Sequence, residues 1–181
     1  MDSRESNLLA QAINGDRKAL GALLELHYHP LFGYFCSLTK GDAARAEDLT
    51  QETIIKVIGN IEKYRPVTEF KYWLFRIARN TYIDLYRKKS DQPGPNEFDF
   101  SLVQSGEDTG KNLESREFSQ KVRAAINALP DEQKEVVLLK VYADLTFKEI
   151  SEIQGCPINT ALARMRYALM ALKKTIRKES L

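Results

Sequence analysis

Few of the residues that build cross-linked or loop-rich folds occur in this sequence of 181 residues, which has 2 Cys, 9 Gly and 6 Pro. Cys36 and Cys156 form no Cys-x-x-Cys pair, which argues against a disulfide framework and a zinc knuckle, so we expect buried, reduced thiols. No apolar run approaches the roughly 20 residues that a membrane span needs. Residues 1–11 lack the basic start and apolar core of a signal peptide. We therefore expect a cytoplasmic protein without direct membrane insertion.

The chain also lacks a large excess of basic or acidic residues, but the two kinds are distributed unevenly along it. Residues 1–89 carry a net +3, residues 90–118 a net −5 and residues 119–181 a net +4. The acidic middle clusters Pro, Gly and Ser and loses helical periodicity, so residues 90–117 are predicted to form a flexible acidic linker. Screening beyond about 8 Å at physiological salt favours a solvated tether over one folded back on the basic domains. The chain is thus predicted to hold two domains, residues 1–89 and 118–181.

Apolar residues recur at spacings of three and four in both domains and no convincing strand pattern occurs, which predicts an all-α fold class. In the N-terminal domain, helix breaks are expected at Gly15-Asp16 and at His29-Pro30. The helical run over residues 44–64 is expected to bury Ile54, Val57, Ile58 and Ile61. The run over residues 70–89 is expected to bury Phe70, Trp73, Leu74, Ile77, Ala78 and Leu85.

The C-terminal domain carries the pattern of a helix-turn-helix. Two helices are expected first, over residues 118–129 and 131–142. Thr146 and Glu149 then have the spacing of a capping box at the start of a short helix, and residues 154–157 turn the chain. The helix that follows the turn is expected to keep one apolar side, formed by Ala161, Met165, Ala168, Leu169 and Leu172. This order of elements predicts a helix-turn-helix.

The predicted helix over residues 70–89 has a second side, made of the residues that do not belong to its buried stripe. Cations and aromatic rings alternate on this side. Its members are Lys71, Tyr72, Phe75, Arg76, Arg79, Tyr82, Tyr86 and Arg87. Rings stack on unpaired bases and guanidinium groups follow phosphates, so this side suits single-stranded DNA. The alternative for any one ring, such as Phe75 or Tyr82, is packing against a neighbouring helix.

The second helix of the helix-turn-helix suits duplex DNA. Its outward residues are Asn159, Thr160, Ala163, Arg166 and Tyr167, followed by Lys173, Lys174, Arg177 and Lys178. Such a helix can enter a major groove with phosphate-binding cations behind it. The alternative is a solvated basic helix end that the helix dipole favours. The capping box and the turn before the helix favour DNA.

Groups that would carry catalysis are scarce. His27 and His29 lie two residues apart on one predicted helix and point in different directions, so they cannot share a metal. A P-loop, a Gly-rich phosphate loop and a nucleophile elbow are missing. Glu47, Asp48 and Glu52 could suggest a divalent-metal nuclease, but no partner carboxylate motif accompanies them. We therefore expect that the protein is not an enzyme and takes no metal or cofactor.

Three segments resemble, in order, the extracytoplasmic-function sigma factors of bacteria: AEDLTQETIIKVI, EFKYWLFRIARNTYIDLYRKK and LPDEQKEVVLLKVYADLTFKEISEI with its following helix. The resemblance covers nearly the whole chain except the acidic segment and the extreme termini. It implies a sigma factor reduced to domains 2 and 4, which binds core RNA polymerase, recognises promoter DNA and helps to melt it. It also implies control by an anti-sigma factor, and association with the nucleoid while in holoenzyme.

The resemblance further implies a role for particular residues. The face that docks on the beta-prime clamp helices of the polymerase would consist of Asp48, Gln51, Glu52 and Lys56. Minus-10 recognition and melting would use Lys71, Tyr72, Arg76, Arg79, Asn80, Tyr82 and Arg87, with residues 63–71 as the loop around a flipped base. Minus-35 recognition would use Asn159, Thr160, Arg164, Arg166, Lys173 and Lys174. The beta flap would dock on the apolar surface around Val136, Val137 and Tyr142.

The recognition helix departs from the pattern Gly-Thr-Val-Lys-Ser-Arg that many family members carry. Leu162 and Ala163 cannot donate hydrogen bonds to bases or phosphates. Minus-35 contacts must then use Asn159, Thr160, Arg164 and Arg166, or groove shape. A competing interpretation is a helix-turn-helix repressor whose N-terminal bundle binds a ligand or dimerises. It explains the C-terminal domain equally well but leaves the cationic, aromatic side of residues 70–89 without a role.

Overall fold

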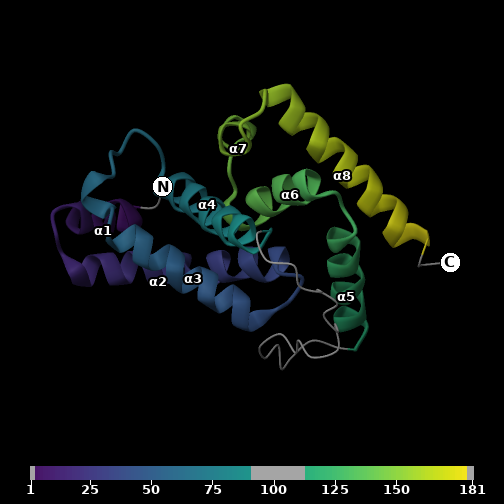
Figure 1. The fold of residues 1–181 in the computed structure, drawn as a ribbon, viewed down its shortest axis with the longest axis horizontal. Coiled ribbons are helices and arrows are strands. Elements are labelled where there is room, and N and C mark those ends of the chain that lie inside the picture. Colours follow the sequence, from purple (N-terminus) through teal and green to yellow (C-terminus); the bar gives the residue numbers. More distant parts are fainter. Residues whose placement is uncertain (1–2, 91–112, 179–181) are drawn as a thin grey trace. The chain divides into compact units, whose positions relative to one another are not determined.

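The structure is a computed structural model that describes residues 3–90 and 113–178, with side chains described for residues 3–85 and 119–176. Within these ranges every regular element is helical, which confirms the all-α fold class. The chain forms two compact units, one on each side of the acidic segment (Figure 1). Residues 91–112, which make up most of the predicted linker, lie outside the described residues. No helix of the described ranges is long and apolar enough to cross a membrane.

The described part of the N-terminal unit consists of α1 (Ser3–Ile13), α2 (Arg17–Leu38), α3 (Ala43–Ile58), the 3-10 helix η1 (Ile61–Lys63) and α4 (Phe70–Ser90). The predicted break at Gly15-Asp16 is confirmed, because Gly15 adopts a φ of 91° and Asp16 caps α2. The Asp16 carboxylate accepts hydrogen bonds from the backbone N–H groups of Lys18 (2.8 Å) and Ala19 (3.1 Å).

The predicted break at His29-Pro30 is wrong, because Pro30 lies inside α2. A proline inside a helix costs about 3 kcal/mol through a lost hydrogen bond and a steric clash. Buried side chains hold α2 in place on both sides of Pro30, namely Leu23, Leu24, Leu31, Tyr34 and Phe35. Packing of α2 against the rest of the unit therefore outweighs the local preference of proline.

Aromatic contacts fix the rotation of α4 within the N-terminal unit. α2 packs against α1 and α3, and α3 packs against α4. The ring of Phe75 on α4 meets Tyr34 of α2 edge-on, with centroids 5.3 Å apart. At the start of α4, Phe70 and Trp73 both contact Tyr64, with centroid separations of 6.0 and 5.2 Å. These contacts decide which side of α4 is left available.

The described part of the C-terminal unit consists of α5 (Leu113–Asn127), α6 (Asp131–Ala143), α7 (Phe147–Gln154) and α8 (Ile158–Lys178). α8 contacts the other three helices. Leu129, Val137 and Ala168 form a buried cluster against which Met165 and Leu172 pack. The long last helix therefore organises this unit.

α7 and α8 form the predicted helix-turn-helix. The capping box is confirmed, since the backbone N–H of Thr146 donates to the Glu149 carboxylate (2.8 Å) and that of Glu149 donates to the Thr146 hydroxyl (3.3 Å). Gly155 ends α7 with a φ of 63°, in the left-handed region where glycine carries no steric cost. Both devices fix the angle at which the chain enters α8.

Several expectations for this unit are wrong. α5 begins at Leu113, inside the range predicted as linker, rather than at Phe118. Val136 and Val137, assigned to the beta-flap surface, are 0% and 5% exposed, because α6 packs against both α7 and α8. Leu169 is 55% exposed, because the buried side of α8 centres on residues 161 and 168. Cys36 and Cys156 form no disulfide, as expected, but both are half-buried rather than buried.

Candidate functional site

One side of α3 stays exposed after the helix has packed between α2 and α4. Asp48, Gln51 and Glu52 all lie on this exposed side, so the structure brings together the three residues predicted to share it. Ile55 and Ile58 extend it with apolar surface and are 68% and 51% exposed. We call these five residues the α3 face.

The assignment of Ile58 to the core is therefore wrong, and the sequence analysis missed Ile55. Thr50 and Thr53 are fully buried instead, which is possible because their hydroxyls donate to the carbonyls of Ala46 (2.7 Å) and Leu49 (2.8 Å). A buried threonine that bonds its own helix behaves like a small apolar residue in packing. The apolar residues displaced from the core lie on the α3 face.

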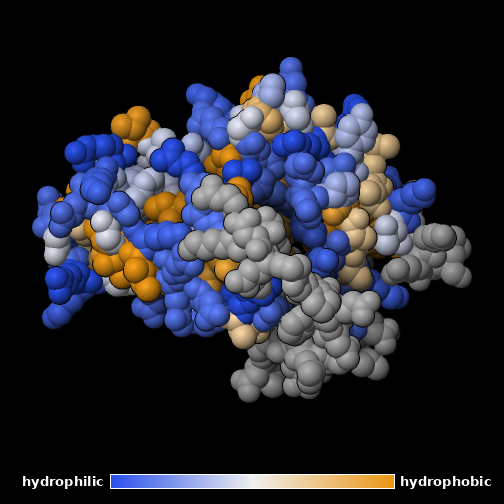
Figure 2. Space-filling model, in the orientation of Figure 1, coloured by the Kyte–Doolittle hydropathy of each residue, from blue (hydrophilic) through white to orange (hydrophobic). Residues whose placement is uncertain are grey.

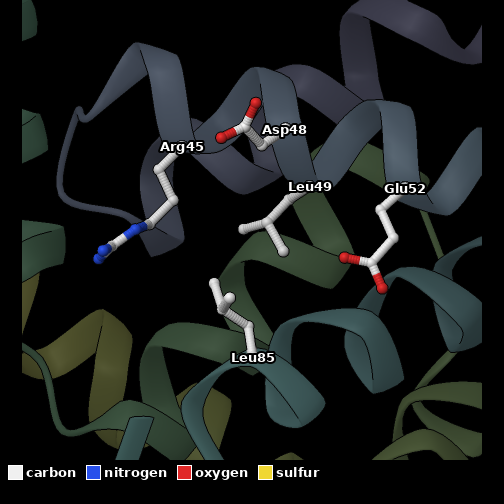
Figure 3. Close-up of a pocket in the computed structure, with 5 residues that line it drawn as sticks. All are labelled: Arg45, Asp48, Leu49, Glu52 and Leu85. Atoms are coloured by element: carbon white, nitrogen blue, oxygen red, sulfur yellow. The ribbon is translucent and has the colours of Figure 1, made fainter. Parts of the chain in front are cut away.

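A shallow pocket of about 250 Å³ opens beside the α3 face (Figure 3). It is lined by Arg45, Asp48, Leu49, Glu52 and Leu85. The side chains of Leu49 on α3 and Leu85 on α4 point toward each other and form an apolar floor. Arg45 and Glu52 lie on opposite sides of that floor. The pocket could accept an apolar side chain flanked by charges of both signs.

Gln51 is positioned by a hydrogen-bond chain that starts on α2. The hydroxyl of Tyr28 donates to one oxygen of Glu47 (2.6 Å), and the amide of Gln51 donates to the other (2.9 Å). The hydrogen bond from Tyr28, followed by that from Gln51, lowers the pKa of Glu47, and the same bond raises the pKa of Tyr28. Glu47 thus stays an ionised acceptor that holds the Gln51 side chain against α3.

Lys56 was predicted to lie with Asp48, Gln51 and Glu52, but the structure places its ammonium between α3 and α4. The ammonium lies 2.9 Å from the Glu52 carboxylate and donates to the Thr81 hydroxyl at 3.1 Å. The Asp84 carboxylate lies 3.9 Å away. Lys56 therefore joins the α3 face to α4.

Two rings predicted on the exposed side of α4 are buried. Phe75 is 0% and Tyr72 is 5% exposed, so the prediction that they offer stacking surfaces is wrong for the free protein. For Phe75 the alternative of packing against a neighbouring helix is confirmed. Tyr82 is half-buried, and its hydroxyl donates to the carbonyl of Leu38 (3.3 Å). Because α4 packs against both α2 and α3, more of its circumference is buried than a single apolar stripe would cover.

The other residues predicted to hold the minus-10 strand differ in exposure. Arg76 and Asn80 are exposed, whereas Lys71 and Arg79 are half-buried. The Arg76 guanidinium lies 5.8 Å from the centroid of the Tyr72 ring, and the Lys71 ammonium lies 3.1 Å from the Glu69 carboxylate. The side chain of Arg87 lies outside the described residues.

A groove of about 340 Å³ runs between the end of α3 and α4, and we call it the α3–α4 groove. It is lined by Lys56, Asn60, Lys63, Trp73, Ile77, Asn80 and Asp84. Its volume falls in the range of about 300–1,000 Å³ that small-molecule sites occupy. The ring in this groove is Trp73, which the sequence analysis assigned to the core but which is only half-buried. Trp73 lies seven residues before Asn80, a spacing that could have placed both on one side of α4.

The loop before α4 is anchored at its base and open at its tip. Tyr64 is buried, and its hydroxyl donates to the carbonyl of Thr68. Val67 is 88% exposed. Lys63, at the end of η1 just before this loop, lines the α3–α4 groove together with residues of α4.

α8 presents four of its six predicted DNA-binding residues to solvent: Asn159, Arg166, Lys173 and Lys174. They lie on the side opposite to the buried residues Ala161 and Ala168. Thr160 is half-buried. The cations on this side give it the positive charge that suits a polyanion.

Arg164 belongs to the turn rather than to the exposed side. Its guanidinium donates to the Gln154 side-chain oxygen (2.9 Å) and to the Cys156 sulfur (3.5 Å). The Gln154 amide in turn donates to the backbone carbonyl of Glu132 (3.1 Å) and to the Glu135 carboxylate (2.7 Å). Arg164 thus ties α8 to the turn and to α6.

Comparisons with known proteins agree with this arrangement. Residues 23–92 match the family model of Sigma-70 region 2, and residues 119–172 match that of Sigma-70, region 4. The ECF RNA polymerase sigma factor EcfG of Rhodopseudomonas palustris is 30% identical over 140 residues, which cover 77% of this chain and 75% of that protein. The ECF RNA polymerase sigma factor SigW of Bacillus subtilis is 29% identical over 178 residues, covering 93% and 95%.

Solved structures give the same result. The sigma factor RpoE of Bartonella quintana, in complex with the anti-sigma factor NepR, superposes with a TM-score of 0.70 at 25% identity and covers 88% of this chain and 98% of that one. CnrH, in complex with the cytosolic domain of CnrY, has a TM-score of 0.70 at 21% identity, with 97% and 99% coverage, and supports the fold alone.

Two helical units, the second with a helix-turn-helix, and matches to regions 2 and 4 define a two-domain sigma factor. The chain belongs to the extracytoplasmic-function sigma factors, as the resemblance implied. It acts with RNA polymerase in promoter-directed transcription initiation. The match of the N-terminal unit to region 2 argues against the competing interpretation of a repressor.

The contacts of Arg164 predict that it stabilises the helix-turn-helix, in contrast to Arg166. Arg164→Ala should lower the free energy of opening α7 and α8 by about 1–2 kcal/mol, because two half-buried acceptors lose their donor. Arg166→Ala, at an exposed position, should change it by less than about 0.5 kcal/mol. Native-state hydrogen exchange of peptides from α7 and α8 measures both. Equal protection in the two variants would contradict the structural role of Arg164.

Proposed function

We propose that the N-terminal unit serves as sigma domain 2, through the α3 face and the α3–α4 groove, and that the C-terminal unit serves as sigma domain 4. The observation that carries this proposal is the contrast between two neighbouring surfaces of one helix pair. The α3 face combines carboxylates with exposed isoleucines, whereas the groove combines an indole ring and two amides with two lysines, an isoleucine and one carboxylate. The first suits a protein partner and the second suits an unpaired base.

The α3 face is the proposed docking site for the beta-prime clamp helices of core polymerase. Asp48 and Glu52 supply negative charge that suits a basic partner, and Ile55 and Ile58 supply apolar surface. Interfaces of this kind gain affinity from buried apolar anchors and specificity from charge complementarity. Lys56 contributes indirectly, by holding Glu52 and linking α3 to α4.

The α3–α4 groove is the proposed site for a base of the melted minus-10 strand. Trp73 offers a ring, Asn80 offers an amide that can read a base edge, and Lys63 offers a cation for a phosphate. Stacking on such a ring contributes about 1–3 kcal/mol per base, which offsets the few kcal/mol needed to unstack it. Of the tyrosines predicted to stack on bases, Tyr72 is buried and the Tyr82 hydroxyl donates a hydrogen bond to the carbonyl of Leu38 on α2. We therefore assign the stacking role to Trp73 instead.

The exposed side of α8 is the proposed reader of the minus-35 duplex. Asn159 is positioned to reach base edges from the first turn, and Arg166, Lys173 and Lys174 are positioned to bind phosphates. For the beta flap, the exposed Val141 (67%) replaces the buried Val136 and Val137. We further propose that the protein is cytoplasmic, is associated with the nucleoid while in holoenzyme, and has no catalytic step of its own.

An anti-sigma factor is the proposed regulator. The sigma factor RpoE of Bartonella quintana is in complex with the anti-sigma factor NepR. We propose that a partner of this class covers the α3 face of this chain. The exposed isoleucines would then be shielded from water while the protein is not bound to polymerase.

A charge-reversal experiment tests the α3 face. Charge reversal of Asp48 and Glu52 together, to lysine, should weaken binding to core polymerase by at least about 2 kcal/mol, roughly thirtyfold, because a basic partner then meets like charge. Fluorescence anisotropy of labelled protein titrated with core polymerase measures this. Glu25→Lys combined with Glu62→Lys reverses the same number of exposed charges elsewhere on the unit and should leave the affinity unchanged. Unchanged affinity in the Asp48 and Glu52 variant would refute this docking site.

A substitution of Asn80 tests the α3–α4 groove. Asn80→Ala should leave closed-complex formation intact and slow strand opening about tenfold, as expected for one lost hydrogen bond to a captured base. Permanganate reactivity of unpaired thymines in reconstituted holoenzyme reports opening. A template melted in advance at minus 10 should largely restore activity. If closed-complex binding fell as much as opening, or if the melted template gave no rescue, the groove would not capture a strand.

A further inference from the structure

Exposed apolar side chains stand on the first two turns of α8, where the helix is proposed to meet DNA. Leu162 is 43% exposed and Ile158, one turn earlier, is 45% exposed. The core of the C-terminal unit does not need them, because Ala161, Met165 and Ala168 fill the buried side of the helix. Figure 2 shows hydrophobic residues among the hydrophilic ones on the visible face of the protein.

The surroundings of Leu162 indicate what it touches. Asn159 precedes it by three residues and Arg166 follows it by four, so all three side chains neighbour one another on the exposed side of α8. An amide and a guanidinium in those positions are suited to base edges and phosphates. An apolar side chain between them needs an apolar group at the same depth of the groove.

The major groove of DNA presents one apolar group, the C5-methyl of thymine. We propose that Leu162, with Ile158 beside it, reads thymine methyl groups in the minus-35 duplex. This inference rests on the proposed entry of α8 into the major groove. Contact with thymine methyl groups would take the place of the hydrogen bonds that Leu162 and Ala163 cannot donate. The cations Arg166, Lys173 and Lys174 on the same side favour a polyanion over an apolar protein as the occupant.

The test removes the methyl from the DNA and the side chain from the protein. A promoter duplex is selected by the reconstituted holoenzyme from random sequence, and each minus-35 thymine is replaced in turn by deoxyuridine, which lacks only the methyl. Wild-type holoenzyme should lose about fourfold in affinity at one or two thymines, the equivalent of one methyl group losing its contact. Leu162→Ala holoenzyme should bind the thymine duplex more weakly and should not distinguish thymine from deoxyuridine there.

Leu169→Ala provides the matched control, since Leu169 is the same residue type on the same helix, 55% exposed and two turns further on. This variant should keep the full discrimination. Retained discrimination in Leu162→Ala, or no discrimination by wild type at any thymine, would overturn the inference. A loss of core polymerase affinity in Leu162→Ala with discrimination unchanged would assign Leu162 to a protein contact and overturn it as well.

One further variant separates this inference from the proposed function. Arg166→Ala should weaken duplex binding and reduce its salt dependence by about one phosphate contact. Suppose that Arg166→Ala weakens duplex binding but Leu162→Ala still distinguishes thymine from deoxyuridine. In that case α8 reads the duplex and only the inference about Leu162 fails. If Arg166→Ala binds as the wild type does, the entry of α8 into the groove fails, and the inference fails with it.

Discussion

Burial of one wide sector of α4 is the constraint on which the N-terminal unit depends. Leu74, Phe75 and Ala78 are completely buried, and Phe75 meets Tyr34 of α2 edge-on. Fully burying a Leu or Phe side chain contributes about 1.5–3 kcal/mol, so α4 cannot rotate without losing several kcal/mol. Trp73 and Asn80 must then border the groove beside α3. The groove that we propose as the DNA site is thus fixed by packing on the other side of the same helix.

α3 has the complementary position, since it packs against α2 and α4 and keeps only one side free. The pocket floor of Leu49 and Leu85 and the contacts of Lys56 join α3 to α4 at two levels. A partner that docks on the α3 face therefore holds the groove in a fixed orientation. Under the proposed function, this arrangement would let one small unit bind polymerase and present a strand-binding groove at the same time.

Local signals in the sequence were sufficient for the helical class, the turn at Gly15-Asp16, the capping box and the shared exposure of Asp48, Gln51 and Glu52. Features that depend on contacts between helices cannot be predicted from such local signals. Periodicity at 100° per residue finds one stripe, but α4 has neighbours on two sides, so Tyr72 and Phe75 were placed outside and Trp73 inside. The continuous helix through Pro30 and the hydrogen bond from Arg164 to Gln154 also depend on contacts between helices, so local sequence signals do not predict them.

The central claim is that the α3 face contacts polymerase while the adjoining groove contacts DNA. Photoreactive side chains placed singly at Ile55 and at Lys63 in reconstituted holoenzyme test both halves in one promoter complex. The account predicts that the probe at Ile55 crosslinks to the polymerase in closed and open complexes alike, and that the probe at Lys63 crosslinks to DNA only after opening. Crosslinks from both positions to polymerase alone, with no DNA product at Lys63 in the open complex, would contradict it.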